Sequence, residues 1–155
     1  MSLKDQLSAD LRDAMRAGDE TRKSTLRMLI TAVRNAEIPP EGAASTGRTE
    51  LDDEGVLNVV RKEVKQRRDS IELYGKANRL DLVANEEAEV NVLAAYLPRQ
   101  MSRVEIEAVA RGIIERLGAA GLADKGKVMP AIMTELRGKA EGREINAVVT
   151  ELLGD

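Results

Sequence analysis

The chain has 155 residues, of which 33% are charged, and a formal net charge of −3. It contains no cysteine and no histidine, which excludes disulfides, thiolate nucleophiles and histidine-based metal or acid–base sites. Only two residues are aromatic, Tyr74 and Tyr96, which leaves almost nothing from which to build a base-stacking surface for single-stranded nucleic acid. This length fits one domain or two small lobes.

Location can also be predicted from composition. No apolar run approaches the roughly 18 residues that a membrane span needs. The N-terminus lacks the charged and apolar regions of a signal peptide. We therefore expect a cytoplasmic protein without membrane association. The acidic net charge argues against a general DNA-coating protein, so any nucleic-acid contact must come from a local basic patch.

Helical periodicity runs through the chain and no segment alternates as a strand does, so an all-α fold is expected. The first helix is predicted over about residues 3–17, capped by Ser2, and the second over residues 20–35, ended by the two prolines that follow. A loop is expected at residues 41–50. The methionines on the apolar stripes are predicted to be core residues: Met15, Met28, Met129 and Met133.

The third helix should begin near Asp52, because the acidic residues there suit the positive end of the helix dipole, and should end at Gly75. Arg67 falls where an apolar residue is expected, so we predict that its stem lies along the core and its guanidinium points outward. The fourth helix is predicted over about residues 80–97, with Asn78 as its N-cap.

Ser102 and Glu105 form a capping box that should open a fifth helix. The sixth helix requires Pro130 in its first turn, where a missing donor costs little, and a seventh follows. A boundary is predicted between Leu97 and Pro98, because the proline interrupts the helix and a new cap follows at once. The expected architecture is a four-helix lobe, residues 1–97, and a three-helix lobe, residues 98–155.

Enzymatic motifs are incomplete. Residues 121–127 match a phosphate-binding P-loop up to Lys127, but Val128 stands where serine or threonine would hold magnesium, and a helix precedes the segment. Lys125 and Lys127 could still bind one phosphate at a helix start, or the segment is an ordinary loop. No serine has a histidine to activate it, and no carboxylates have calcium-ligand spacing. We expect no catalytic residue, metal site or cofactor.

Two basic segments could contact a phosphate backbone, and for both the alternative is a solvated surface. Residues 125–143 hold five basic side chains against two acidic ones: Lys125, Lys127, Arg137, Lys139 and Arg143. The third helix offers a secondary basic face made of Arg61, Lys62, Lys65 and Arg68. Without aromatic residues, either surface would recognise charge and shape and not sequence.

Short patterns in the C-terminal lobe closely resemble the tail domain of the GatB/YqeY family: Gly-Lys-Val-Met at 126–129, Gly-Lys-Ala at 138–140 and Ile-Asn-Ala-Val-Val at 145–149. The rest of the chain looks like stand-alone YqeY proteins, on three patterns: Arg-Met-Leu at 27–29, the basic run at 61–70 and Tyr-Leu-Pro-Arg-Gln-Met-Ser at 96–102. The resemblance implies an all-α fold with a GatB/YqeY-type three-helix tail.

In the GatB subunit of tRNA-dependent amidotransferases, this tail binds tRNA. The resemblance therefore implies a non-catalytic tRNA-binding accessory whose partner is an amidotransferase or an aminoacyl-tRNA synthetase. Proteins of this family often carry the label of a carbon–nitrogen ligase with glutamine as amide donor, which we interpret as inherited from GatB. The alternatives are a protein–protein interaction module without RNA binding and a glutamine-dependent amidotransferase active by itself.

Overall fold

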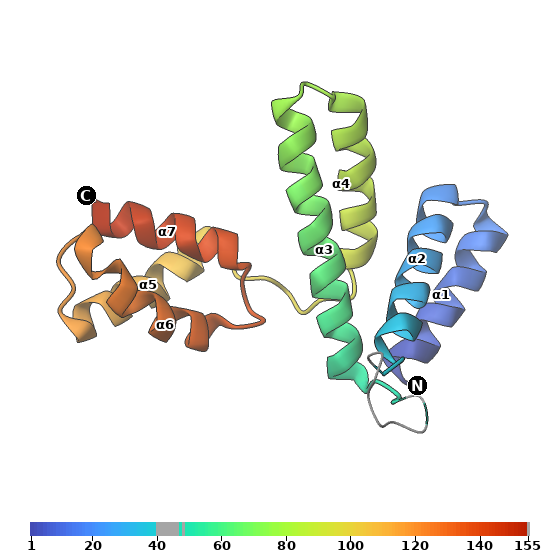
Figure 1. Cartoon of the computed structure of the whole chain (residues 1–155), viewed down its shortest axis with the longest axis horizontal. Helices are drawn as coiled ribbons and strands as arrows, with labels where there is room; N and C mark the ends of the chain where they lie inside the picture. Colours follow the sequence, from blue (N-terminus) through green and yellow to red (C-terminus); the bar gives the residue numbers. More distant parts are fainter. Residues whose placement is uncertain (40–46, 48, 155) are drawn as a thin grey trace. The chain divides into compact units, whose positions relative to one another are not determined.

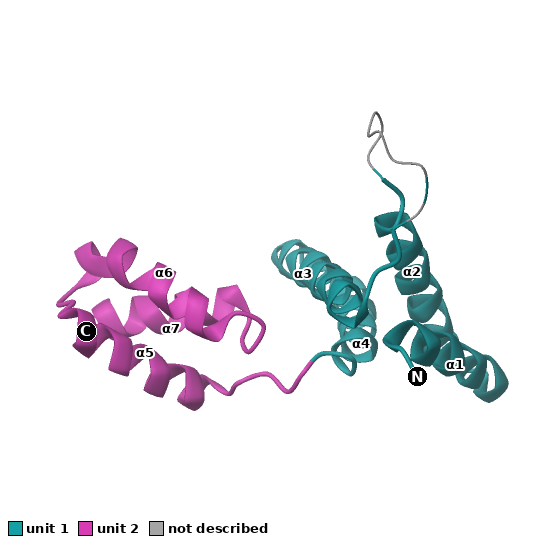
Figure 2. Ribbon diagram, turned by 90° about the horizontal axis from the view of Figure 1, so that it is seen from below, with its two compact units in different colours: residues 1–97 teal, residues 98–155 magenta. Residues whose placement is uncertain are grey.

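A computed structural model describes residues 1–39, 47 and 49–154, and its regular elements are all helices. The all-α prediction is confirmed, since no strand occurs in these ranges. The chain divides into two compact units, Met1–Leu97 and Pro98–Asp155 (Figure 2). The loop expected at residues 41–50 lies largely outside the described residues.

The first unit contains four helices (Figure 1): α1, Leu3–Ala17; α2, Glu20–Ala36; α3, Asp53–Lys76; and α4, Leu80–Ala94. Three of them begin where a polar side chain accepts a hydrogen bond from a free first-turn N–H. These caps are Ser2 for α1, Asp19 for α2 and Asp52 for α3. Gly18, with φ of 68°, ends α1 in the left-handed conformation that favours glycine.

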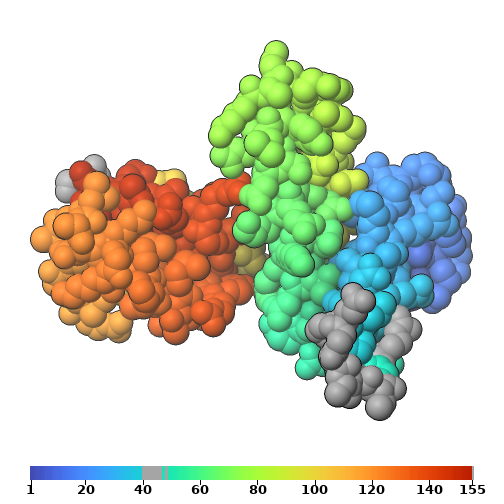
Figure 3. All heavy atoms as spheres, in the orientation of Figure 1, coloured from blue at the N-terminus to red at the C-terminus, as the bar shows by residue number. Residues whose placement is uncertain are grey.

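The core of this unit lies at the base of the α3–α4 hairpin, where α1 and α2 pack against it. Its largest fully buried side chains include Leu7, Leu26, Leu29, Val60 and Leu93. The far end of the hairpin projects beyond α1 and α2 (Figure 3). No residue from 68 to 89 is fully buried. The outer half of α3 and α4 is thus held together chiefly by contacts between these two helices.

Arg67 corrects a prediction, because its guanidinium is buried and does not point outward. The residue is 8% exposed, with Nη1 2.7 Å from Glu63 Oε2 and Nε 3.0 Å from Glu89 Oε2. Burial alone would lower the pKa of Arg67, but the hydrogen bond to Glu63 and the charge of Glu89 outweigh it and raise that pKa. Arg67 falls on the apolar stripe of α3 because this position faces inward, and there its guanidinium meets the carboxylates of Glu63 and Glu89.

The α3–α4 turn also differs from prediction. Asn78 is not the N-cap of α4; it adopts φ of 56°, a left-handed conformation that asparagine tolerates, and Arg79 precedes the first helical residue without a side-chain cap. Gly75 lies inside α3, which continues to Lys76. At the other end, α4 stops at Ala94, three residues before Leu97.

The methionine prediction is only partly right. Met15 and Met28 are 45% and 44% exposed, so they do not belong to the core of the first unit. Met129 and Met133 are half-buried and pack against the core of the second unit.

The second unit contains α5, Arg103–Leu117; a 3-10 turn η1, Leu122–Asp124; α6, Lys125–Leu136; and α7, Gly142–Gly154. Each of the three α-helices packs against the other two, around a core that includes Ile106, Val128, Ile132 and Val148. The predicted capping box is confirmed: Glu105 N–H donates to Ser102 Oγ, and Ser102 N–H donates to Glu105 Oε2.

Pro130 lies in the second turn of α6, not the first, because η1 leads directly into a helix that already begins at Lys125. Proline has no N–H, so the carbonyl four residues earlier, on Gly126, loses its helical donor. Gly126 is exposed, and water can reach this carbonyl. The proline therefore weakens only one bond near the start of the helix.

Candidate nucleic-acid interface

The basic residues predicted in the C-terminal unit form two groups at opposite ends of α6. Lys125 and Lys127 lie in its first turn, whereas Arg137 and Lys139 follow its last residue and Arg143 lies at the start of α7. Twelve helical residues separate these ends by about 18 Å at 1.5 Å per residue. The five side chains therefore do not make one compact cluster, although all of them lie along or beside one helix.

The turn between α6 and α7 fixes the backbone that carries the second group. Gly138 adopts φ of 77°, and the N–H groups of Lys139 and Ala140 both donate to the carbonyl of Leu136, at 2.9 and 3.2 Å. The Met101 N–H donates to the carbonyl of Lys139 at 2.8 Å, which joins this turn to the start of α5. The side chains of Arg137 and Lys139 remain exposed on this anchored turn.

The first group lies beside the end of α7. The 3-10 turn η1 packs against this end of α7. Leu122 Cδ1 in η1 lies 4.0 Å from the position that a Cβ atom on Gly154 would occupy. Asp124 Oδ2 accepts a hydrogen bond from the N–H of Ala120 at 2.9 Å and makes no side-chain cap for α6. Lys127 is exposed and Lys125 half-buried, next to first-turn N–H groups that have no side-chain cap.

Ion pairing separates these residues from three other arginines of the unit. Arginines at the start and middle of α5 are paired: Arg99 with Glu105 at 2.7 Å, Arg103 with Glu107 and Glu151, and Arg111 with Glu107 at 4.0 Å. Within the described ranges, Lys125, Lys127, Arg137 and Lys139 have no carboxylate within ion-pair distance. The unit as a whole is neutral, with nine basic and nine acidic residues from 98 to 155. Four unpaired cations of the unit thus lie around α6, and among the described residues Arg116 at the end of α5 also has no carboxylate at that distance.

The secondary basic face on α3 is partly neutralised by its own helix. Arg61 Nη1 lies 3.0 Å from Glu54 Oε1 and 2.7 Å from Asn58 Oδ1, and Lys65 Nζ lies 3.1 Å from Asp69 Oδ2. Lys62 is exposed and Arg68 half-buried. Pairs of this kind reduce the field that a phosphate would meet, so this face is the weaker candidate.

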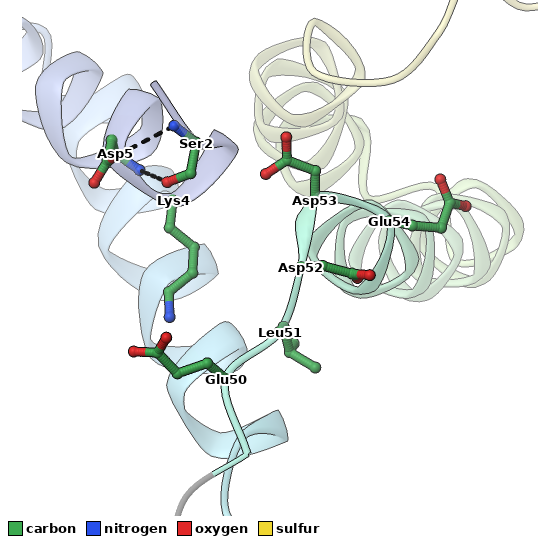
Figure 4. A pocket seen from close by; sticks show the side chains of 8 residues that line it. All are labelled: Ser2, Lys4, Asp5, Glu50, Leu51, Asp52, Asp53 and Glu54. Atoms are coloured by element: carbon green, nitrogen blue, oxygen red, sulfur yellow. Dashed lines mark hydrogen bonds between the residues drawn. The ribbon is translucent and has the colours of Figure 1, made fainter.

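An acidic hollow lies between the starts of α1 and α3 (Figure 4), lined by Ser2, Lys4, Asp5, Leu51 and four further acids: Glu50, Asp52, Asp53 and Glu54. Most of its carboxylates have structural roles. Asp5 completes the cap of α1, Asp52 caps α3, and Asp53 Oδ1 accepts a hydrogen bond from the N–H of Leu3 at 2.9 Å. An acidic surface repels phosphate, so this hollow is not a nucleic-acid site.

The P-loop-like segment forms η1 and the first turn of α6, and α5 precedes it, not a strand. Among the described residues, no group of three or more acidic side chains is arranged to hold a metal ion. Among the same residues, no helix combines the length and apolar character that crossing a membrane requires.

Comparison with known proteins identifies the family. A family model described as "Yqey-like protein" matches residues 4–153. The chain belongs to the YqeY-like protein family. This match covers both units, from the first turn of α1 to the last of α7.

Three fungal relatives of this YqeY-like protein share the name "Altered inheritance of mitochondria protein 41, mitochondrial". The relative in Lachancea thermotolerans is 36% identical over 113 residues, which cover 72% of this chain and 57% of the relative. The one in Pyrenophora tritici-repentis is 28% identical over 153 residues, or 96% of this chain and 80% of the relative. The one in Saccharomyces cerevisiae strain YJM789 is 29% identical over 113 residues, or 72% and 58%. The chain thus spans little more than half the length of two of these relatives.

These names correct the expected location. The sequence predicted a cytoplasmic protein, but the relatives are named as mitochondrial proteins. The comparison therefore contradicts the cytoplasmic prediction.

Proposed function

We propose that this YqeY-like protein is a non-catalytic tRNA-binding accessory, and that its C-terminal unit contacts the phosphate backbone. One observation carries the proposal: among the described residues, Lys125, Lys127, Arg137 and Lys139 lack carboxylate partners, whereas the arginines at the start and middle of α5 are paired. An unpaired cation can displace counterions from a phosphate without first breaking an ion pair. The resemblance of residues 126–149 to the tRNA-binding tail of GatB supports the same assignment.

The two groups give this surface two contact points, one at each end of α6. A separation of about 18 Å spans several phosphates along a nucleic-acid strand, where neighbouring charges on one strand lie about 3.4 Å apart along the axis. No aromatic side chain belongs to either group, so bases cannot be stacked on aromatic rings there. The expected ligand is thus a folded RNA recognised by the shape and charge of its backbone.

The proposed role contains no chemical step on this chain. The carbon–nitrogen ligase label would belong to a separate amidotransferase, to which this protein presents or delivers tRNA, or the partner is an aminoacyl-tRNA synthetase. Turnover of glutamine and ATP by the isolated protein would contradict this part of the proposal.

Binding of unfractionated tRNA to paired variants tests the surface. Lys125→Ala with Lys127→Ala removes one contact point, and Arg137→Ala with Lys139→Ala removes the other. We expect each double variant to weaken binding about fivefold or more, because charge-assisted contacts to phosphate contribute about 1 kcal/mol or more per pair removed. The matched control is Arg99→Ala with Arg111→Ala, which removes two charges from the same unit where both are ion-paired. Equal losses in all three variants, or none, would contradict the proposal and favour a protein-interaction module.

A further inference from the structure

A second set of unpaired cations lies in the other unit, on one side of the α1–α2 pair. The two helices run side by side in opposite directions (Figure 1). Arg27 Nη2 on α2 lies 3.5 Å from Met15 Sδ on α1, which places these two residues on the same side of the pair. Arg12 is one turn before Met15 on α1, and Arg34 is two turns after Arg27 on α2.

Antiparallel packing brings Arg12 close to Arg27. Because α1 ends at Ala17 and α2 begins at Glu20, residues equally far from this turn lie level, so Arg12 is level with Thr25, and Arg34 lies two turns beyond Arg27 along the same side of α2. All three arginines are exposed. We call this surface the arginine face and define it as Arg12, Met15, Arg27, Ile30 and Arg34.

The remaining basic residues of α1 and α2 all have ion-pair partners: Lys4 with Glu37 at 2.6 Å, Arg16 with Asp13 at 3.1 Å, Arg22 with Asp10 at 3.8 Å and Lys23 with Glu20 at 3.0 Å. Arg12, Arg27 and Arg34 have no carboxylate at that distance in the part of the chain that the structure describes. The acidic residues of these two helices therefore pair with other cations or cap a helix, and the three arginines without a carboxylate partner lie on one face.

Apolar side chains lie among these arginines. Met15 is 45% exposed, and Ile30, one turn from Arg27 and Arg34 on α2, is only partly buried against the core. An exposed methionine is flexible and polarisable, which suits contact with apolar side chains of varied shape. A phosphate backbone would leave Met15 and Ile30 uncontacted, and the face has no aromatic residue on which a base could stack.

We propose that the arginine face docks an acidic amphipathic protein segment. Its carboxylates would bind Arg12, Arg27 and Arg34, because a planar guanidinium can donate two parallel hydrogen bonds to one carboxylate. Its apolar side chains would lie on Met15 and Ile30, as in the binding of an amphipathic helix to a helical surface. This interaction is independent of the tRNA proposal, because it uses a different unit and a ligand of different chemistry.

The test observes Met15 directly in the full-length protein labelled with 13C at its methionine methyl groups. The probe is a synthetic helical peptide in which glutamate and leucine side chains lie next to each other on one face of the helix. The control peptide carries glutamine in place of each glutamate. We expect the glutamate peptide to shift the Met15 resonance to saturation and to leave that of Met129, in the other unit, unchanged. The glutamine peptide should produce no shift.

Two matched double variants locate the contact. Arg12→Gln with Arg34→Gln should weaken peptide binding about fivefold or more, since exposed charge pairs contribute up to about 1 kcal/mol each. Arg16→Gln with Lys23→Gln removes two paired charges from the same helices and should change binding less than about twofold. Lys23 is half-buried and the other three side chains are exposed. An unchanged urea-unfolding midpoint shows that the first unit of each variant is folded.

Three results would overturn the proposal. The first is no shift of Met15 at millimolar peptide, and the second is an equal loss of binding in the two double variants. The third is a Met15 shift caused by poly-uridylate RNA but not by the glutamate peptide, which would assign the face to a nucleic-acid backbone instead.

Discussion

The phenol of Tyr96 donates a 2.5 Å hydrogen bond to Asp10 Oδ2, a residue 86 positions earlier in the chain. Tyr96 lies just after α4, two residues before Pro98, and Asp10 lies in the middle of α1. The bond thus ties the last residues of the first unit back to its first helix. Asp10 Oδ1 also lies 3.8 Å from Arg22 Nη2, which joins α2 to the same contact.

Tyr96 should titrate above the usual tyrosine pKa of 10.0, because burial, the hydrogen bond to Asp10 and the charge of Asp10 all raise its pKa. A raised pKa in the folded state stabilises the protein fully below pH 10.0, and this contribution is lost as the pH rises through the folded value. Spectrophotometric titration of a Tyr74→Phe background, where Tyr96 is the remaining phenol, measures the pKa. Asp10→Asn should lower it toward 10.0. An unchanged titration in that variant would show that the contact is not formed.

Arg67 is predicted to act with Glu63 and Glu89 as a unit. Arg67→Met leaves two partly buried carboxylates without their cation, and we expect a loss of about 2–3 kcal/mol in the free energy of unfolding. Adding Glu63→Gln and Glu89→Gln should restore at least about half of that loss, because the uncompensated charges are then absent. Urea unfolding of the single and triple variants checks this. A triple variant less stable than Arg67→Met would contradict the account.

The carboxylate of Glu37 holds two distant segments of the first unit. Oε2 accepts from Lys4 Nζ at 2.6 Å and from the N–H of Leu51 at 2.9 Å, and the residue is 4% exposed. Glu37→Ala should cost about 2 kcal/mol in urea unfolding, because the partly buried N–H of Leu51 and the ammonium of Lys4 both lose their acceptor. Glu37→Gln, which keeps an oxygen for Leu51, should cost less. The control is Glu20→Gln, an exposed ion-paired acid whose change is expected to remain within about 0.5 kcal/mol.

The capping box of α5 predicts that the carboxyl group of Glu105 titrates at a lower pH than usual. The hydrogen bond from the Ser102 N–H lowers the pKa of Glu105, and Arg99 lowers it further. A lowered pKa stabilises the folded state above the usual value of 4.5, and this contribution is lost as the pH falls through the folded value. A carboxyl 13C titration should therefore place Glu105 below 4.5, and Arg99→Gln should raise it only partway, since the backbone bond remains. A value at or above 4.5 in the unchanged protein would show that the box does not form.

The helix starts could be predicted from the sequence because capping is local chemistry. Ser2, Asp52 and Ser102 each bond to an N–H three residues ahead, and the pattern is visible in the chain. The placement of Arg67 could not be predicted, because its second carboxylate lies 22 residues away on another helix. The exposure of Met15 likewise depends on how α2 packs, not on the stripe along α1.

The candidate interface was predictable only in part. Sequence patterns located the basic residues around α6, but not which arginines of the unit are already paired: Arg103 meets Glu151 on α7, 48 residues later. The arginine face had no sequence signal of its own, since its members are spread over residues 12–34 and alternate with paired charges. Finding it requires the packing of α1 against α2 and the knowledge of which basic residues of these helices already have ion-pair partners.

The dependence of tRNA affinity on salt tests the central proposal most directly. Unfractionated tRNA and a duplex DNA of similar length are titrated with the unchanged protein at three salt concentrations. Four phosphate contacts, from Lys125, Lys127, Arg137 and Lys139, predict a log–log slope of binding constant against salt of about −3, because each contact contributes about −0.7 to −0.9. The resemblance to the tRNA-binding tail of GatB predicts a preference for tRNA over DNA. No binding at low salt, a slope near zero, or equal affinity for the two nucleic acids would contradict the proposal.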